Sequence, residues 1–111
     1  MSAAGAELAR VVLVTAPDLA CARALARGLV ERRLAACVNL VPGLESVYRW
    51  EGKIESASEV LLLVKTTAGH LRELESFLAA EHPYDVPECI ALEPAEVESS
   101  YLAWLLAEAG A

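Results

Sequence analysis

The chain has 111 residues, of which 56% are hydrophobic and 5% aromatic, and its formal net charge is −7. This length suits a single domain with one hydrophobic core. Nine Lys and Arg residues against sixteen Asp and Glu residues supply no basic face for a phosphate backbone, so nucleic acid is excluded as an expected partner.

No membrane or secretory segment is expected. The apolar stretch Val11–Ala16 is far shorter than the roughly 20 residues that cross a membrane. Residues 1–9 lack the basic segment of a signal peptide and are expected to form a short mobile leader before a single domain over residues 10–111. The three cysteines are widely separated and form no CxxC pair, which argues against a disulfide framework or a zinc ribbon. A cytoplasmic location is therefore predicted.

The first half of the domain predicts a strand and a helix. Arg10–Thr15 has the composition of a buried strand, and Pro17-Asp18 opens a helix that ends with Glu31–Arg33. Its apolar residues recur at i, i+3, i+4, i+7 and i+8, as expected for a helix with one buried face. These residues are Ala22, Leu25, Ala26, Leu29 and Val30.

Residues 34–55 predict one long β-hairpin with a break in its first strand. Strand alternation from Cys37 is interrupted at Pro42-Gly43, because proline donates no N–H and glycine permits a bulge. Pairing resumes to Trp50, and the chain reverses at Glu51–Lys53. A strand of roughly 15 residues is about 50 Å long. A globule of 111 residues has a radius of gyration of only about 13 Å.

This long hairpin therefore predicts self-association, because its own domain is too small to cover it. Its far end carries Tyr48 and Trp50, aromatic residues of the kind enriched at protein interfaces. An uncovered hairpin of this kind would be an aggregation hazard in a monomer. The two rings are accordingly predicted to lie in a subunit interface.

The second half completes an α+β fold. Glu59–Lys65 predicts a central strand covered on both faces, and Gly69–Glu81 a helix that Pro83 ends. Glu88–Glu93 predicts a fourth, buried strand, and Ser99–Ala109 a final helix. The order is βαββαβ followed by a C-terminal helix, which is the ferredoxin-like sandwich with an extended hairpin between its second and third strands.

The residues alone indicate no enzyme and no required cofactor, since no nucleophile–base pair or cofactor motif is visible. Cys37 fits either a structural role or a soft metal ligand. His82 follows a helix C-terminus, where an imidazolium or a bound metal is favoured, although a packing role explains it equally well. Glu81 and Cys89 are possible co-ligands for His82, but no metal-binding spacing rule is satisfied.

Four long motifs resemble the CutA family of divalent-cation tolerance proteins. They are VTAP at Val14–Pro17, LAACVNLVPGLESVYRWEGKIE at Leu34–Glu55, EVLLLVKTT at Glu59–Thr67 and HPYDVPE at His82–Glu88. The resemblance implies a homotrimer whose hairpin pairs with a neighbouring subunit, an architecture like that of the PII signal proteins. It also implies a link to tolerance of copper and other divalent cations, with no catalytic reaction.

The resemblance also suggests site residues. Some family members carry a cysteine before the Thr-Ala-Pro and two histidines before the Pro-Tyr, where this chain has Val14, Glu81 and His82. His82 is therefore the first expected ligand for copper or another divalent cation, supported by Glu81 and Cys37. The alternative function is a PII-like sensor that binds a small anionic ligand in an inter-subunit cleft. That cleft would be lined by Lys65, Tyr84 and Trp50.

Overall fold

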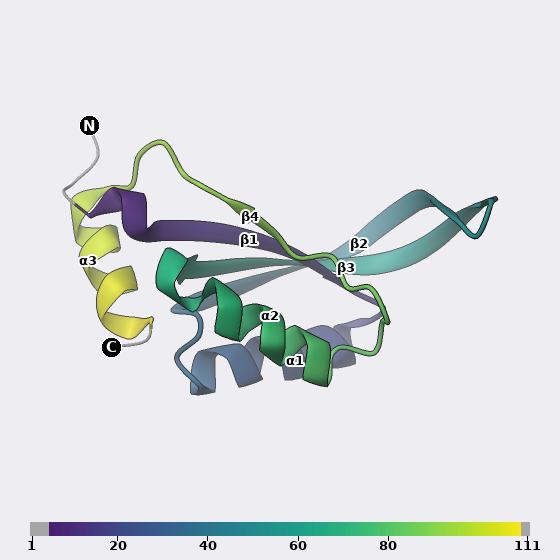
Figure 1. The fold of residues 1–111 in the computed structure, drawn as a ribbon, viewed down its shortest axis with the longest axis horizontal. Helices are drawn as coiled ribbons and strands as arrows, with labels where there is room; N and C mark the ends of the chain where they lie inside the picture. The colour runs from purple at the N-terminus through teal and green to yellow at the C-terminus, as the bar shows by residue number, and fades with distance from the viewer. Residues whose placement is uncertain (1–4, 110–111) are drawn as a thin grey trace.

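The computed structural model describes residues 5–109 and confirms the predicted α+β, ferredoxin-like architecture (Figure 1). Its elements are η1 (Ala6–Leu8), β1 (Ala9–Ala16), α1 (Leu19–Glu31), β2 (Cys37–Trp50), β3 (Lys53–Thr67), η2 (Ala68–His70), α2 (Leu71–Glu81), β4 (Ile90–Leu92) and α3 (Ser99–Glu108). The four strands form one antiparallel sheet in the order β2-β3-β1-β4. In the described part of the chain, no helix is long and apolar enough to cross a membrane.

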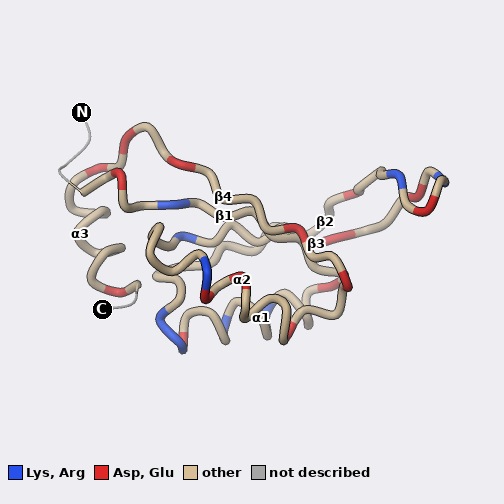
Figure 2. The backbone as a smooth tube through the Cα atoms, viewed as in Figure 1, with Lys and Arg blue, Asp and Glu red and all other residues tan. Residues whose placement is uncertain are grey.

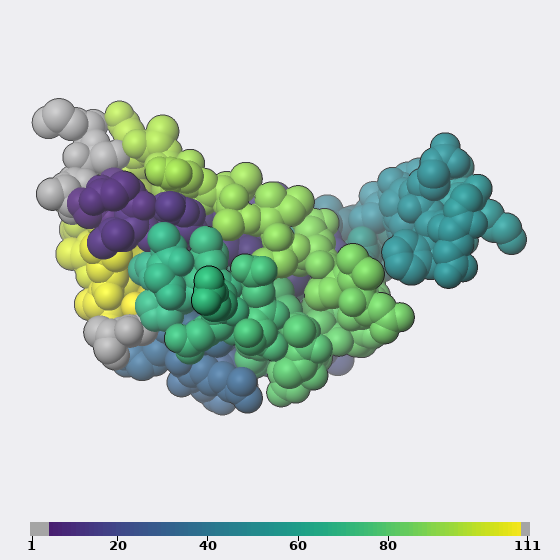
Figure 3. Space-filling model, in the orientation of Figure 1, coloured from purple at the N-terminus to yellow at the C-terminus, as the bar shows by residue number. Residues whose placement is uncertain are grey.

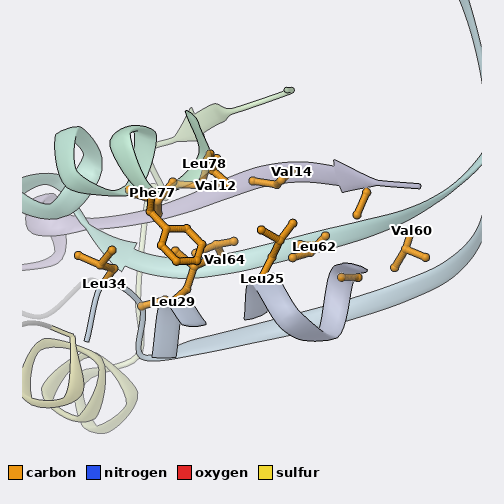
Figure 4. Close-up of a cluster of buried hydrophobic side chains, with 14 residues drawn as sticks. Val12, Val14, Leu25, Leu29, Leu34, Val60, Leu62, Val64, Phe77 and Leu78 are labelled. Atoms are coloured by element: carbon orange, nitrogen blue, oxygen red, sulfur yellow. The ribbon is translucent and has the colours of Figure 1, made fainter. Parts of the chain in front are cut away.

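The main core lies between α1, α2 and one face of the sheet (Figure 4). Side chains at alternate positions of β1 and β3 point into it, because successive strand residues face opposite sides. The largest side chains of this core are Val12, Val14, Leu25, Leu29, Leu34, Val60, Leu62, Val64, Leu74, Phe77 and Leu78. Gly28 lets the two helices approach closely, since a Cβ at that position would lie 2.8 Å from Cζ of Phe77.

Asp18 caps the start of α1, as expected for a helix that opens at Pro17-Asp18. The Asp18 carboxylate accepts a hydrogen bond of 2.8 Å from the N–H of Cys21, which satisfies one of the free donors at the start of α1. The predicted helix over Gly69–Glu81 is divided, with η2 leading into α2.

A second, smaller cluster joins the two ends of the chain. Ala6 and Ala9 pack with Leu102 and Leu105 of α3, which lies across the end of the sheet where β1 begins (Figure 1). Residues 1–4 of the expected leader lie outside the described residues, whereas residues 6–8 form η1 and residue 9 begins β1.

The β2–β3 hairpin has the predicted break and turn. Glu51 and Gly52 both have positive φ, at 49° and 78°, as a two-residue type I′ turn requires. The register shifts between Val41 and Leu44, and Gly43 takes a φ of 83° there. Beyond this bulge the hairpin stands away from the body, and we call residues 44–59 the arm (Figures 1 and 3).

Two expectations about burial are wrong. The strand predicted at Glu59–Lys65 was expected to be covered on both faces, but the helices cover only the face that carries Val60, Leu62 and Val64. The fourth strand is Ile90–Leu92 rather than Glu88–Glu93, and it is exposed because it is an edge strand that pairs only with β1.

The sheet surface opposite α1 and α2 is therefore apolar and largely uncovered, and we call it the open face. Residues in cross-strand register share a face, which assigns its members. They are Val11, Leu13, Thr15, Cys37, Asn39, Val41, Leu61, Leu63, Lys65, Ile90 and Leu92. Val41, Ile90 and Leu92 are exposed, and Leu13, Leu61 and Leu63 are half-buried.

Candidate functional site

A recess lined by aromatic and charged side chains lies between the arm and the body, and we call it the arm cleft. It has a volume of about 570 Å³. Tyr48 and Trp50 line it from β2, Glu59 from β3, and Tyr84 and Glu88 from the loop between α2 and β4. The arm and the Pro-bounded loop thus supply the two walls.

The charged groups of the arm cleft are acidic. The Tyr84 hydroxyl donates a hydrogen bond of 2.8 Å to the Glu59 carboxylate. Burial raises the pKa of Glu88, and the like charge of Glu59 raises it further. Burial and the bond to Glu59 likewise raise the pKa of Tyr84, which stays a neutral donor at neutral pH. No Lys or Arg is among the described lining residues.

His82 holds the loop that carries Tyr84, one of the residues that line the cleft. The backbone N–H of Tyr84 donates to His82 Nδ1 at 3.0 Å, and His82 Nε2 lies 2.8 Å from the carbonyl oxygen of Thr15. Because Nδ1 accepts a hydrogen bond, the ring hydrogen is on Nε2, which donates a hydrogen bond to the Thr15 carbonyl oxygen. The ring is 7% exposed and its centroid lies 4.7 Å from that of Tyr84. Both nitrogens are engaged, so coordinating a metal requires His82 to give up a hydrogen bond.

The structure does not bring the three expected metal ligands together. Glu81 is exposed and lies 4.0 Å from Arg32 in an ion pair, while Cys37 lies on the open face opposite Lys65. Within residues 5–109, no three His, Cys, Asp or Glu side chains form a group that could hold a metal ion.

The expected anion-binding set is only partly assembled. Tyr84 and Trp50 line the arm cleft, but Lys65 does not, and it donates instead to the side chain of Asn39. Lys65 lies on the same face of β3 as Glu59 but six residues farther along, which is about 20 Å at the rise of a strand. The charged side chains that line the arm cleft are therefore carboxylates, where the lysine Lys65 was expected. Sequence reasoning had no signal that pairs Glu59 with Glu88, because they come from separate elements.

Glu88→Gln is expected to stabilise the protein at neutral pH. The folded state raises the pKa of Glu88 above its ordinary value of 4.5, so the folded protein holds this proton more tightly than the unfolded chain. The bound proton stabilises the folded state fully below pH 4.5. This stabilisation is lost as pH rises through the higher pKa that Glu88 has in the folded protein. Urea unfolding should give similar midpoints for both proteins at acidic pH and a higher midpoint for the variant at pH 7. A variant that is no more stable than the parent at pH 7 would contradict a raised pKa of Glu88 in the folded protein.

Comparison with known proteins assigns the family. Residues 10–108 match the family model of the CutA1 divalent ion tolerance protein. The chain belongs to the CutA1 family. It is 52% identical over 100 residues to the divalent-cation tolerance protein CutA of Thermus thermophilus, covering 90% of this chain and 97% of that protein. Its identity to the CutA of Pectobacterium atrosepticum is 52% over 95 residues, which is 86% of each chain.

Solved CutA1 structures share the fold. The Thermus thermophilus protein superposes with a TM-score of 0.91 at 50% identity, covering 93% of this chain and all of that one. CutA1 from Oryza sativa gives a TM-score of 0.90 at 44% identity over 93% of this chain and 94% of that one. The names of the Thermus thermophilus and Pectobacterium atrosepticum proteins refer to divalent-cation tolerance and specify no reaction.

Proposed function

We propose that the protein is a non-enzymatic, cytoplasmic homotrimer that binds divalent cations, copper foremost, and contributes to tolerance of these ions. The names of its relatives support the link to divalent cations. The free thiols Cys21, Cys37 and Cys89 suit a reducing compartment. The observation that carries the proposal is the open face, whose apolar side chains are left uncovered by the single chain.

Assembly follows from this surface and the arm. Monomeric proteins rarely expose large contiguous apolar patches, and the open face extends across all four strands. The arm continues the same sheet with Trp50 and Val47, which are 48% and 68% exposed. A second copy that covers the open face would place Tyr48 and Trp50 at the subunit interface, where their rings still line the arm cleft.

The proposed metal site is formed between subunits. The described residues of one chain hold no group of three suitable ligands, and in this proposal the ligands come from several copies. Of the three expected ligands, only Cys37 lies on the open face that a second copy would meet. His82 is already bonded through both nitrogens, and Glu81 pairs with Arg32. Cys37 is therefore the leading copper ligand in this proposal.

A calorimetric copper titration under reducing conditions tests the metal site. The parent protein is expected to bind a whole number of ions per assembly. Cys37→Ser should bind roughly tenfold more weakly or worse, because copper is held as copper(I) under reducing conditions and this ion prefers a thiolate to a hydroxyl. Cys21→Ser makes the same change on α1, where the thiol packs against the main core, and should bind as the parent does. Weak heat without stoichiometry in all three proteins would contradict the proposal.

A further inference from the structure

The arm cleft contains two carboxylates without a basic partner. The ion pairs among residues 5–109 involve neither Glu59 nor Glu88, and within the same range the side chains that line the cleft form one hydrogen bond with each other, from Tyr84 to Glu59. Figure 2 shows acidic positions gathered where the arm leaves the body. Two carboxylates that repel each other in a partly desolvated recess favour the entry of a positive charge.

The walls of the cleft determine which kind of cation fits. Tyr48, Trp50 and Tyr84 supply three aromatic rings, whose faces attract cations, and Trp binds them best. Val47 and Val86 add apolar surface from the arm and the loop. The volume of about 570 Å³ lies in the range of small-molecule sites, roughly 300–1,000 Å³.

We propose that the arm cleft binds a small organic cation, an amine or quaternary ammonium compound with an apolar body. The ammonium group lies between Glu59 and Glu88, and the apolar body contacts the aromatic walls. A hard divalent ion is less suited, because it requires six or more oxygen ligands and Glu59 already accepts a bond from Tyr84. An anion is disfavoured by both carboxylates. This site is separate from the proposed copper site at Cys37, and either can fail without the other.

Fluorescence offers a direct test, because the chain has two tryptophans and only Trp50 lines the cleft. In a Trp104→Phe background, tetramethylammonium chloride is titrated at constant ionic strength and the emission of Trp50 is recorded. Saturable change is expected, and Glu88→Gln should weaken the apparent affinity by roughly tenfold, since a charge-assisted contact is lost. Glu73→Gln removes the same charge from an exposed position on α2 and should leave the affinity unchanged.

Three further titrations make the test decisive. The neutral analogue tert-butanol should produce no comparable change. An equal response to tert-butanol would show that the cleft binds apolar molecules regardless of their charge, and it would overturn the proposal. The proposal is also overturned if magnesium or copper chloride gives the same saturable signal, because that result would indicate a metal site. Failure of both tetramethylammonium and 1,4-diaminobutane to bind the assembled protein would also overturn it.

Discussion

Leu63→Glu is expected to convert the assembled protein into monomers. Leu63 lies in the middle of the open face, in register with Leu13 on one side and Asn39 on the other. If a second copy covers this face, the new carboxylate is buried without a partner at a cost of several kcal/mol. Sedimentation velocity at about ten-micromolar protein should show the parent as a single assembled species and the variant at the size of one chain.

Ala24→Glu is the matched control for this experiment. It introduces the same side chain at an exposed position of α1, on the opposite side of the molecule from the open face. This variant should sediment like the parent. A Leu63→Glu protein that is folded by circular dichroism and still sediments as the parent does would show that the open face is not the interface.

His82→Ala is expected to lower the free energy of unfolding by about 2–4 kcal/mol. The change removes two hydrogen bonds, leaves the Tyr84 N–H and the Thr15 carbonyl without their partner, and opens a cavity behind the cleft. Urea unfolding at a fixed protein concentration measures the loss. Tyr84→Phe, which keeps the backbone N–H and removes only the hydroxyl bond to Glu59, should lose about 1 kcal/mol.

The same variant separates the two interpretations of His82. A folded His82→Ala protein with undiminished stability and no copper binding would restore this histidine as a metal ligand. Reduced stability with copper binding retained would establish it as the residue that fixes the loop carrying Tyr84. The hydrogen bonds at both ring nitrogens favour the second result.

The arm could be predicted in detail because its residues impose backbone constraints. Pro42-Gly43 forced the break, and the Glu51-Gly52 turn has the positive φ values that such a short connection needs. Burial was harder to predict. The apolar run in β3 indicates apolar surroundings on both faces, but the chain itself supplies only one of them. An exposed edge strand such as β4 carries the same apolar residues as a buried one.

The site could be predicted only in part, because sequence proximity does not show which side chains meet. Tyr84 and Trp50 line one cleft of the chain, whereas Lys65 lies elsewhere along β3. The pairing of Glu59 with Glu88 depends on the loop that His82 positions, and this contact leaves no local pattern. The same limit applies to Cys37, whose place on the open face follows from strand register.

The measurement that tests the account most directly is the mass of the unmodified protein in solution. Light scattering coupled to size exclusion, repeated over a tenfold range of concentration, gives this mass without assuming a shape. The proposed homotrimer predicts a constant value of three times the 11.8 kDa chain mass. A constant value of 11.8 kDa would show that one chain tolerates its open face in water. That result would remove the basis for a site formed between subunits.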